Sequence, residues 1–211
     1  MARAMKGYTR IFFDEVVFEA LRFRFASRGG TLQRPERGIF DEELGVDKHM
    51  FKEATKELKR KIENLPKEKR KNAAFFYVEA SGKFVASALK LPCEGIYVDS
   101  TSILVPTQAL RHLCFQYIRC GLGAIDIIVL DDVYDSGETA LKIACAFSNY
   151  FYEKREIPVR ITFAAALRRR QDLERDNYNF STLDFNAIPC CRLLYGKRMH
   201  SMKYFRMPWE R

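Results

Sequence analysis

Three aspartates and a short loop of small residues stand together in the middle of the chain. Asp131 and Asp132 directly follow an apolar run, and Asp135 comes three residues later. The loop 136–139, Ser-Gly-Glu-Thr, offers backbone N–H groups and two hydroxyls to an anion, and Gly137 lets the backbone approach it closely. Neighbouring carboxylates accept hydrogen bonds from a pair of vicinal hydroxyls, directly or through Mg²⁺. This spacing therefore predicts a binding site for a sugar phosphate.

The flanking segments place this motif at the edge of a sheet. The apolar run 125–130 is typical of a strand buried on both faces, and 140–152 has helical spacing. Ligands bind at this point in parallel sheets, where a strand ends and a helix begins, and the helix dipole favours an anion there. The alternative is an acidic turn that only caps a helix, since Asp135 and Ser136 are good N-cap residues.

The other segments alternate between strand and helix patterns. Residues 11–25 form either a helix or a strand followed by a helix. Further strands are expected at 73–78, 95–104, 158–166 and 192–195, and further helices at 47–64, 84–89 and 107–117. This alternation predicts an α/β fold with a central, mostly parallel sheet flanked by helices.

The composition is that of an ordinary globular protein. The 211 residues, 47% hydrophobic and 30% charged, suit one large unit with a small appendage. No apolar run approaches the roughly 20 residues of a membrane-spanning helix, so we expect a soluble protein with no membrane contact. Six cysteines without metal-ligand spacing indicate reduced thiols inside the cell. We expect a cytoplasmic protein, with mitochondria as the alternative because the first ten residues hold three cations and no acid.

The net charge of +9 would attract phosphorylated ligands or nucleic acid, and it fits both. A basic amphipathic helix at 47–64 runs on into the cationic segment 67–71. Such a segment is interpreted as a solvated surface, with RNA contact as the alternative. RNA would also need aromatic side chains for stacking, for which packing near the C-terminus or a dimer contact is the other interpretation. The candidates are Tyr195, Tyr204 and Trp209.

The segment 130–140, Leu-Asp-Asp-Val-Tyr-Asp-Ser-Gly-Glu-Thr-Ala, resembles the PRPP-binding signature of the type I phosphoribosyltransferases. In that signature a hydrophobic strand meets two acids and then an Asp-Ser/Thr-Gly-x-Thr loop. The hypoxanthine-guanine branch of purine salvage is the most similar, because it keeps an acid at the place of Asp135. The resemblance implies that Asp135 is the general base near the purine N7. Asp131 and Asp132 would hold the ribose hydroxyls and Mg²⁺, and the 5-phosphate would be held by Ser136, Gly137, Glu138 and Thr139.

The resemblance extends over about residues 73–206 and implies a type I phosphoribosyltransferase-like fold in three regions. These are an N-terminal helical region at 1–72, an α/β core at 73–182 and a small C-terminal hood at 183–211. Several positions acquire expected roles, although only the central motif is specific. Ser81 and Gly82 stand in the pyrophosphate loop, and 98–102 resembles the strand that leads into a mobile active-site flap. Arg168, or Leu167 beside it, stands where a lysine contacts the purine's exocyclic oxygen. Ile188 and Pro189 with 204–206 resemble the hood, in which Arg206 would face pyrophosphate.

Three positions depart from the family's pattern. The pyrophosphate loop reads Ala80-Ser81-Gly82, which lacks a basic side chain and one glycine. Glu138 occupies a place often held by lysine, and a carboxylate repels a phosphate at short range. Cys190 stands where the hood would supply an acid to Mg²⁺.

These observations support two classes of function. The first is an enzyme, a homo-oligomer that transfers the 5-phosphoribosyl group from PRPP to a purine base such as hypoxanthine or guanine and that also binds nucleoside monophosphates. The second is a catalytically degenerate scaffold or RNA-binding subunit of a larger, mitochondrial ribonucleoprotein assembly. A regulator that binds a nucleotide and controls RNA would combine the two.

Overall fold

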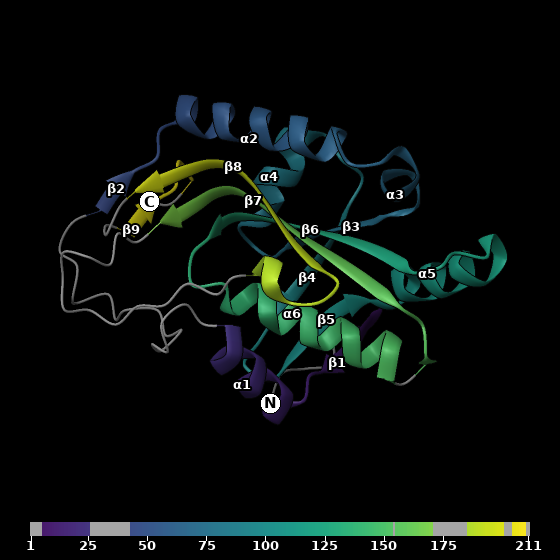
Figure 1. Cartoon of the computed structure of the whole chain (residues 1–211). Helices are drawn as coiled ribbons and strands as arrows, with labels where there is room; N and C mark the ends of the chain where they lie inside the picture. Colours follow the sequence, from purple (N-terminus) through teal and green to yellow (C-terminus); the bar gives the residue numbers. More distant parts are fainter. Residues whose placement is uncertain (1–5, 26–42, 154, 171–184, 201–203, 210–211) are drawn as a thin grey trace.

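The computed structural model describes residues 6–25, 43–153, 155–170, 185–200 and 204–209. Its centre is a seven-stranded sheet in the order β1-β5-β4-β3-β6-β7-β8 (Figure 1). The strands β4, β3, β6, β7 and β8 are mutually parallel, whereas β5 is antiparallel to both β4 and β1. The predicted α/β fold with a mostly parallel sheet is confirmed. The seven strands are β1 (Tyr8–Phe12), β3 (Ala74–Val78), β4 (Glu94–Val98), β5 (Ser102–Pro106), β6 (Ile125–Tyr134), β7 (Val159–Arg170) and β8 (Cys191–His200).

Helices cover both faces of this sheet. The helices are α1 (Glu15–Phe25), α2 (Lys48–Glu63), α3 (Lys67–Asn72), α4 (Gly82–Leu89), α5 (Thr107–Cys120) and α6 (Glu138–Ser148), followed by a π-helical turn (Asn149–Glu153) and a 3-10 turn (Phe185–Ala187). A separate parallel pair joins β2 (Glu43–Gly45) to β9 (Tyr204–Arg206). Within the described ranges, no helix is both long and apolar enough to cross a bilayer.

Strand β6 shows why the sheet is buried on both sides. Ile127 and Val129 point into a cluster with Phe147 of α6, while Ile128 and Leu130 point into a second cluster with α2 and α4. Because side chains alternate along a strand, an uninterrupted apolar run serves both clusters. Figure 1 shows the resulting layers, with α2 and α4 on one face and α1 and α6 on the other.

Helix α2 matches its predicted range of 47–64 closely. The Asp47 side chain accepts a hydrogen bond from the Met50 N–H at 2.7 Å, which satisfies one donor of the first turn, and Asn64 ends the helix. Leu58 and Ile62 bury the apolar side against the sheet, which leaves the lysines outside. The run 67–71, expected as a solvated face, forms α3, and none of the side chains of this helix is buried.

Strand β8 is one edge of the sheet, and side chains bind its outward-facing backbone. The Lys61 ammonium of α2 donates to the Tyr195 carbonyl at 2.9 Å. The Leu193 N–H donates to the Asn186 side-chain oxygen at 2.8 Å. Both groups would otherwise face solvent at an unpaired edge.

Several elements differ from those expected. The alternative of a strand followed by a helix holds for the first segment, and β1 pairs with β5 in the main sheet. Strand β6 continues through Asp131 and Asp132 to Tyr134, and β7 extends to Arg170, because the two strands stay paired through Tyr134 and Arg168. The boundaries placed at 72/73 and 182/183 therefore divide one sheet, since β1 and β8 lie outside the predicted core range.

Candidate functional site

A cleft of about 630 Å³ opens at the carboxyl ends of β3, β4 and β6, beside the start of α6. It contains Asp131, Asp132, Asp135 and the whole loop 136–139, so the structure brings the predicted motif together. Ser81 also lies in it. The other residues lining the cleft are Val78, Glu79, Val98, Asp99, Ser100, Val133, Tyr134, Ala140, Lys142, Phe163 and Met207.

The loop after β6 turns sharply into α6 at Gly137. Gly137 has a φ of 87°, in the left-handed region that L side chains rarely adopt, and it is the N-cap of α6. A glycine offers no side-chain oxygen to the first N–H groups of the helix, although the Ser136 hydroxyl accepts from the Glu138 N–H at 3.3 Å. The N-cap predicted at Asp135 or Ser136 is therefore wrong by one or two positions. A helix N-terminus without a side-chain cap is suited to bind an anion.

Asp131 and Asp132 form a close pair at the base of the cleft. Asp131 is buried, at 6% exposure, and its Oδ1 accepts from the Ser81 hydroxyl at 2.7 Å and from the Asp132 N–H at 2.9 Å. Burial raises the pKa of Asp131 well above its usual value, and so does the neighbouring charge of Asp132, against the lowering effect of the Ser81 hydrogen bond. Burial and the neighbouring carboxylate thus both disfavour the charged form of Asp131.

The segment predicted as the pyrophosphate loop contacts this pair directly. Gly82, the first residue of α4, lies so close to β6 that a Cβ would collide with the Leu130 carbonyl oxygen. This contact explains the glycine, and it places Gly82 beneath the cleft rather than in its lining. The Ser81 hydroxyl is engaged with Asp131, so this loop supports the acid pair.

Glu138 forms an ion pair within the cleft that the sequence analysis did not predict. Its Oε1 lies 2.8 Å from the Lys142 ammonium, one helical turn further along α6. Among the described residues that line the cleft, six are Asp or Glu and only Lys142 is cationic. The i,i+4 spacing of the two residues was a signal that could have identified the pair.

Besides Gly82, two other predicted site residues, Arg168 and Arg206, are not among those lining the cleft. The Arg168 guanidinium lies over the Tyr195 ring, 5.3 Å from its centroid, and the alternative position Leu167 is fully buried. The Arg206 backbone pairs with Gly45 in the β2–β9 sheet, and its side chain lies outside the described part of the structure. Of the C-terminal residues, Met207, which the sequence analysis missed, reaches the cleft. The nearby Trp209 ring stacks on Phe84 at 4.2 Å between centroids.

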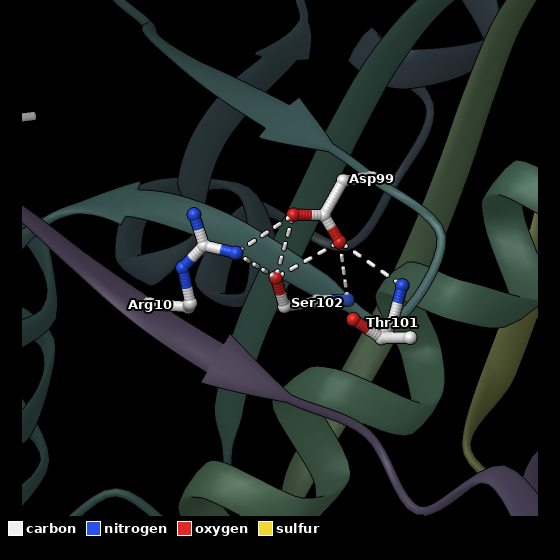
Figure 2. A network of polar contacts seen from close by, with 4 residues as sticks. All are labelled: Arg10, Asp99, Thr101 and Ser102. Carbon is white, nitrogen blue, oxygen red and sulfur yellow. Dashed lines mark hydrogen bonds and ion pairs between the residues drawn. The ribbon is translucent and has the colours of Figure 1, made fainter. Parts of the chain in front are cut away.

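The predicted entry into a mobile flap is a tight turn instead. The Asp99 N–H donates to the Ser102 carbonyl at 2.9 Å, so β4 and β5 are joined by a short hairpin. The Asp99 carboxylate accepts from the Thr101 N–H, the Ser102 N–H, the Ser102 hydroxyl and the Arg10 guanidinium of β1 (Figure 2). Burial raises the pKa of Asp99, but these hydrogen bonds and the charge of Arg10 together lower it below its usual value. This wall of the cleft is therefore fixed by local hydrogen bonds and by the N-terminal strand.

The segment 188–190, predicted as part of a hood, lies at the opposite end of the sheet. The Ile161 N–H donates to the Cys190 carbonyl at 2.9 Å, and Cys190 lies beside Asp126 and Arg160 at the amino ends of β6 and β7. Because β8 runs parallel to β7, the residues before β8 cannot reach the carboxyl ends of the strands. Cys190 thus does not replace a magnesium ligand of the cleft.

The carboxyl groups of the cleft fit a magnesium ion only in part. Among the described residues, no three His, Cys, Asp or Glu side chains are grouped to hold a metal. Asp131 and Asp132 supply two carboxyl groups at the base of the cleft, and a divalent cation would offset the repulsion between them. Mg²⁺ is commonly held by one or two carboxylates, with water and substrate phosphate completing its shell, so the pair fits it in the presence of a ligand.

No family model matches the chain, and no curated protein matches it. Among solved structures it is similar to a hypothetical protein from Neisseria gonorrhoeae with bound ppGpp, at 14% identity and a TM-score of 0.48 over 81% of this chain and 91% of that one. It is also similar to a purine phosphoribosyltransferase from Pyrococcus horikoshii and to the xanthine-guanine-hypoxanthine phosphoribosyltransferase of Helicobacter pylori. Each is 16% identical with a TM-score of 0.42, over 80% of this chain and 94% of the other. The chain itself is an α/β protein with a mostly parallel sheet and helices on both faces.

Proposed function

We propose that the cleft binds the 5-phosphoribosyl group of PRPP or of a purine nucleoside monophosphate, and that the chain transfers this group to a purine base. One observation carries the proposal. The loop 136–139, with its left-handed Gly137 and its helix N-terminus, lies in the same cleft as the acid pair Asp131 and Asp132. A phosphate site and acceptors for two vicinal hydroxyls are thus combined at the end of one strand.

Different residues of the cleft would bind different parts of such a ligand. The 5-phosphate would accept hydrogen bonds from the loop N–H groups and from the hydroxyls of Ser136 and Thr139. The ribose hydroxyls would donate to Asp131 and Asp132. Mg²⁺, when bound, would neutralise part of the ligand's charge at these two carboxyl groups.

In the proposed transfer, a ring nitrogen of the purine forms a bond to C1 of the ribose as the bond from C1 to pyrophosphate breaks. The sugar carries positive charge at that moment, which the surrounding carboxylates favour. The purine gives up its proton to Asp135, and pyrophosphate leaves with the electron pair of the broken bond. The segment at Ser81 supplies no cation to the leaving group, so we expect slow turnover.

Calorimetric titration with PRPP and Mg²⁺ tests the binding step. Gly137→Val should abolish binding, because a β-branched residue strains the left-handed backbone and fills the phosphate position. Gly121→Val is the matched control, since Gly121 has a φ of 58° at the end of α5, outside the residues that line the cleft. Binding that survives in a folded Gly137→Val protein would place the site elsewhere.

A second candidate function is RNA binding, which a separate surface favours. A hollow of about 1080 Å³ lies between α3, α5 and the start of β3, and is lined by Arg70, Lys71 and Arg111 with Glu94 as its only acid among the described residues. Its apolar part includes Phe75 and the half-exposed Phe115. Cations beside an exposed aromatic ring are the groups that bind single-stranded nucleic acid. The hollow and the cleft lie at opposite ends of β3.

A further inference from the structure

We propose that Lys142 is the phosphate-recognising cation of the cleft and that Glu138 holds it in position. This inference rests on the proposed function, since it concerns the ligand of the same site. The loop 136–139 contains a glutamate and no cation. The proposal therefore assigns a specificity-determining role to Lys142, one helical turn beyond Glu138.

Glu138 and Lys142 form an ion pair on one side of α6. Glu138 and Lys142 are the first and fifth residues of the helix, and residues four apart lie on the same side of a helix. The Lys142 ammonium lies 2.8 Å from the Glu138 Oε1, and both residues line the cleft. The Lys142 side chain is only 17% exposed. A lysine would ordinarily extend its ammonium into water, so the ion pair keeps this one inside the cleft.

Acidic residues outnumber cations among the described residues that line the cleft. A bound phosphate would face the carboxyl groups of Asp131, Asp132, Asp135 and Glu138, all of which line the cleft. The helix N-terminus offers only about half a positive charge. Arg10 pairs with Asp99 but is not among the residues that line the cleft. Lys142 is therefore the cation that the described lining can offer to a phosphate, and it also neutralises the nearest carboxylate.

The ion pair does not have to break for this contact to form. An ammonium group has three donors, and one hydrogen bond to Glu138 leaves two for other acceptors. A phosphate at the loop would accept from one of them while Glu138 fixes the direction of the side chain. Such a contact discriminates a phosphorylated ribose from the same sugar without phosphate.

Calorimetry on the whole chain with Mg²⁺ compares two probes, ribose 5-phosphate and adenosine. Lys142→Met should weaken ribose 5-phosphate binding by about ten- to a hundredfold, the usual worth of a hydrogen bond to a charged group. It should leave the weaker adenosine binding unchanged. Lys142→Arg keeps the charge and should retain affinity within a few-fold. Lys56→Met, an exposed lysine of α2, is the control for loss of one positive charge.

Each outcome decides between the two proposals. Wild-type protein that binds ribose 5-phosphate equally well after Lys142→Met would overturn the role of Lys142 and leave the proposed function intact. Wild-type protein that binds neither probe would overturn both. An equal loss for ribose 5-phosphate and adenosine would indicate a structural defect and refute the phosphate contact. If Lys142→Met unfolds, Lys142→Gln serves in its place, with the thermal midpoint of each variant as the check on folding.

Discussion

Asp131 and Asp135 are carboxyl groups of one cleft, and their surroundings assign them different tasks. Asp131 is buried, contacts Ser81 and has a raised pKa, and the proposed function gives it a part in holding the ribose. Asp135 is half-buried at the start of the loop and lines the cleft, where the proposed function makes it the general base. A general base must lie within hydrogen-bond reach of the proton that it removes, so its position matters before its acidity does.

The proposed role of Asp135 in the transfer can be tested by substitution. Asp135→Asn should lower turnover with PRPP and hypoxanthine or guanine by about two to four orders of magnitude, because an amide cannot take the purine proton. Its affinity for PRPP, measured by calorimetry, should change far less and serves as the control. Equal turnover in the two proteins would remove Asp135 from the mechanism. A wild-type protein that binds PRPP without turnover would identify a binding protein that retains the fold.

At the scale of elements, the turn between β4 and β5 depends on a contact across the sheet. Arg10 of β1 and Asp99 meet at 3.0 Å although 89 residues separate them in the chain. The first strand thus stabilises one wall of the cleft. The Asp99 carboxylate accepts several hydrogen bonds from the turn itself, so it stabilises the local conformation.

This network predicts a pH-dependent stability. The pKa of Asp99 is lowered in the folded chain, so its contribution is present above the ordinary aspartate value and is lost as the pH falls below it. Asp99→Asn should lower the thermal midpoint at pH 7 by about 2–4 °C, the equivalent of about 1 kcal/mol for a domain of this size. The difference from wild type should begin to shrink below about pH 4 and should vanish only when the pH has fallen through the lowered pKa of folded Asp99. Glu53→Gln, an exposed acid on α2, should show little effect at either pH. A constant difference across the pH range would contradict this account.

The same contacts explain which elements the sequence could predict. Helix α2 has an aspartate cap and a regular apolar stripe, and β6 has an unbroken apolar run, so local patterns suffice for both. The motif from Asp131 to Thr139 was recognisable because its members are adjacent in the chain. The turn at Asp99 could have been predicted from its local bonds to Thr101 and Ser102, but its ion pair with Arg10 depends on the pairing of β1 with β5. The extension of β6 to Tyr134 likewise depends on pairing with β7. The polar residues Asp131 and Asp132 have no local pattern that predicts this pairing.

At the scale of the whole molecule, the positive charge is separated from the cleft. The net charge is +9, yet the described lining of the cleft holds six acids and one lysine. The cations lie instead on α2, on α3 and around the hollow. This separation gives the RNA proposal a site of its own, independent of the nucleotide.

Charge reversal distinguishes a specific RNA site from a general positive field. Changing Lys67, Lys69, Arg70 and Lys71 to glutamate should weaken RNA binding and reduce its dependence on salt, because each lost phosphate contact lowers the slope of log K against log salt by about 0.7 for a single strand. Nucleotide affinity at the cleft should stay the same. Reversing the exposed lysines 48, 52, 56 and 59 of α2 changes the net charge equally and should weaken RNA binding much less. Filter binding at low salt that detects no RNA, or equal losses from both sets, would leave the charge as a solvated surface.

The bound edge of β8 limits how two copies of this chain can associate. A second chain that extended the sheet at β8, rather than at the other edge β1, would have to displace both Lys61 from the Tyr195 carbonyl and Asn186 from the Leu193 N–H. Continuous sheets across a two-fold axis and fibrils built strand on strand both begin with that step. The Lys61 and Asn186 side chains therefore hinder the pairing of a further strand with β8. Backbone pairing at β8 is therefore disfavoured as a contact between copies, whereas the outer side of α5 exposes the apolar side chains of Phe115 and Ile118.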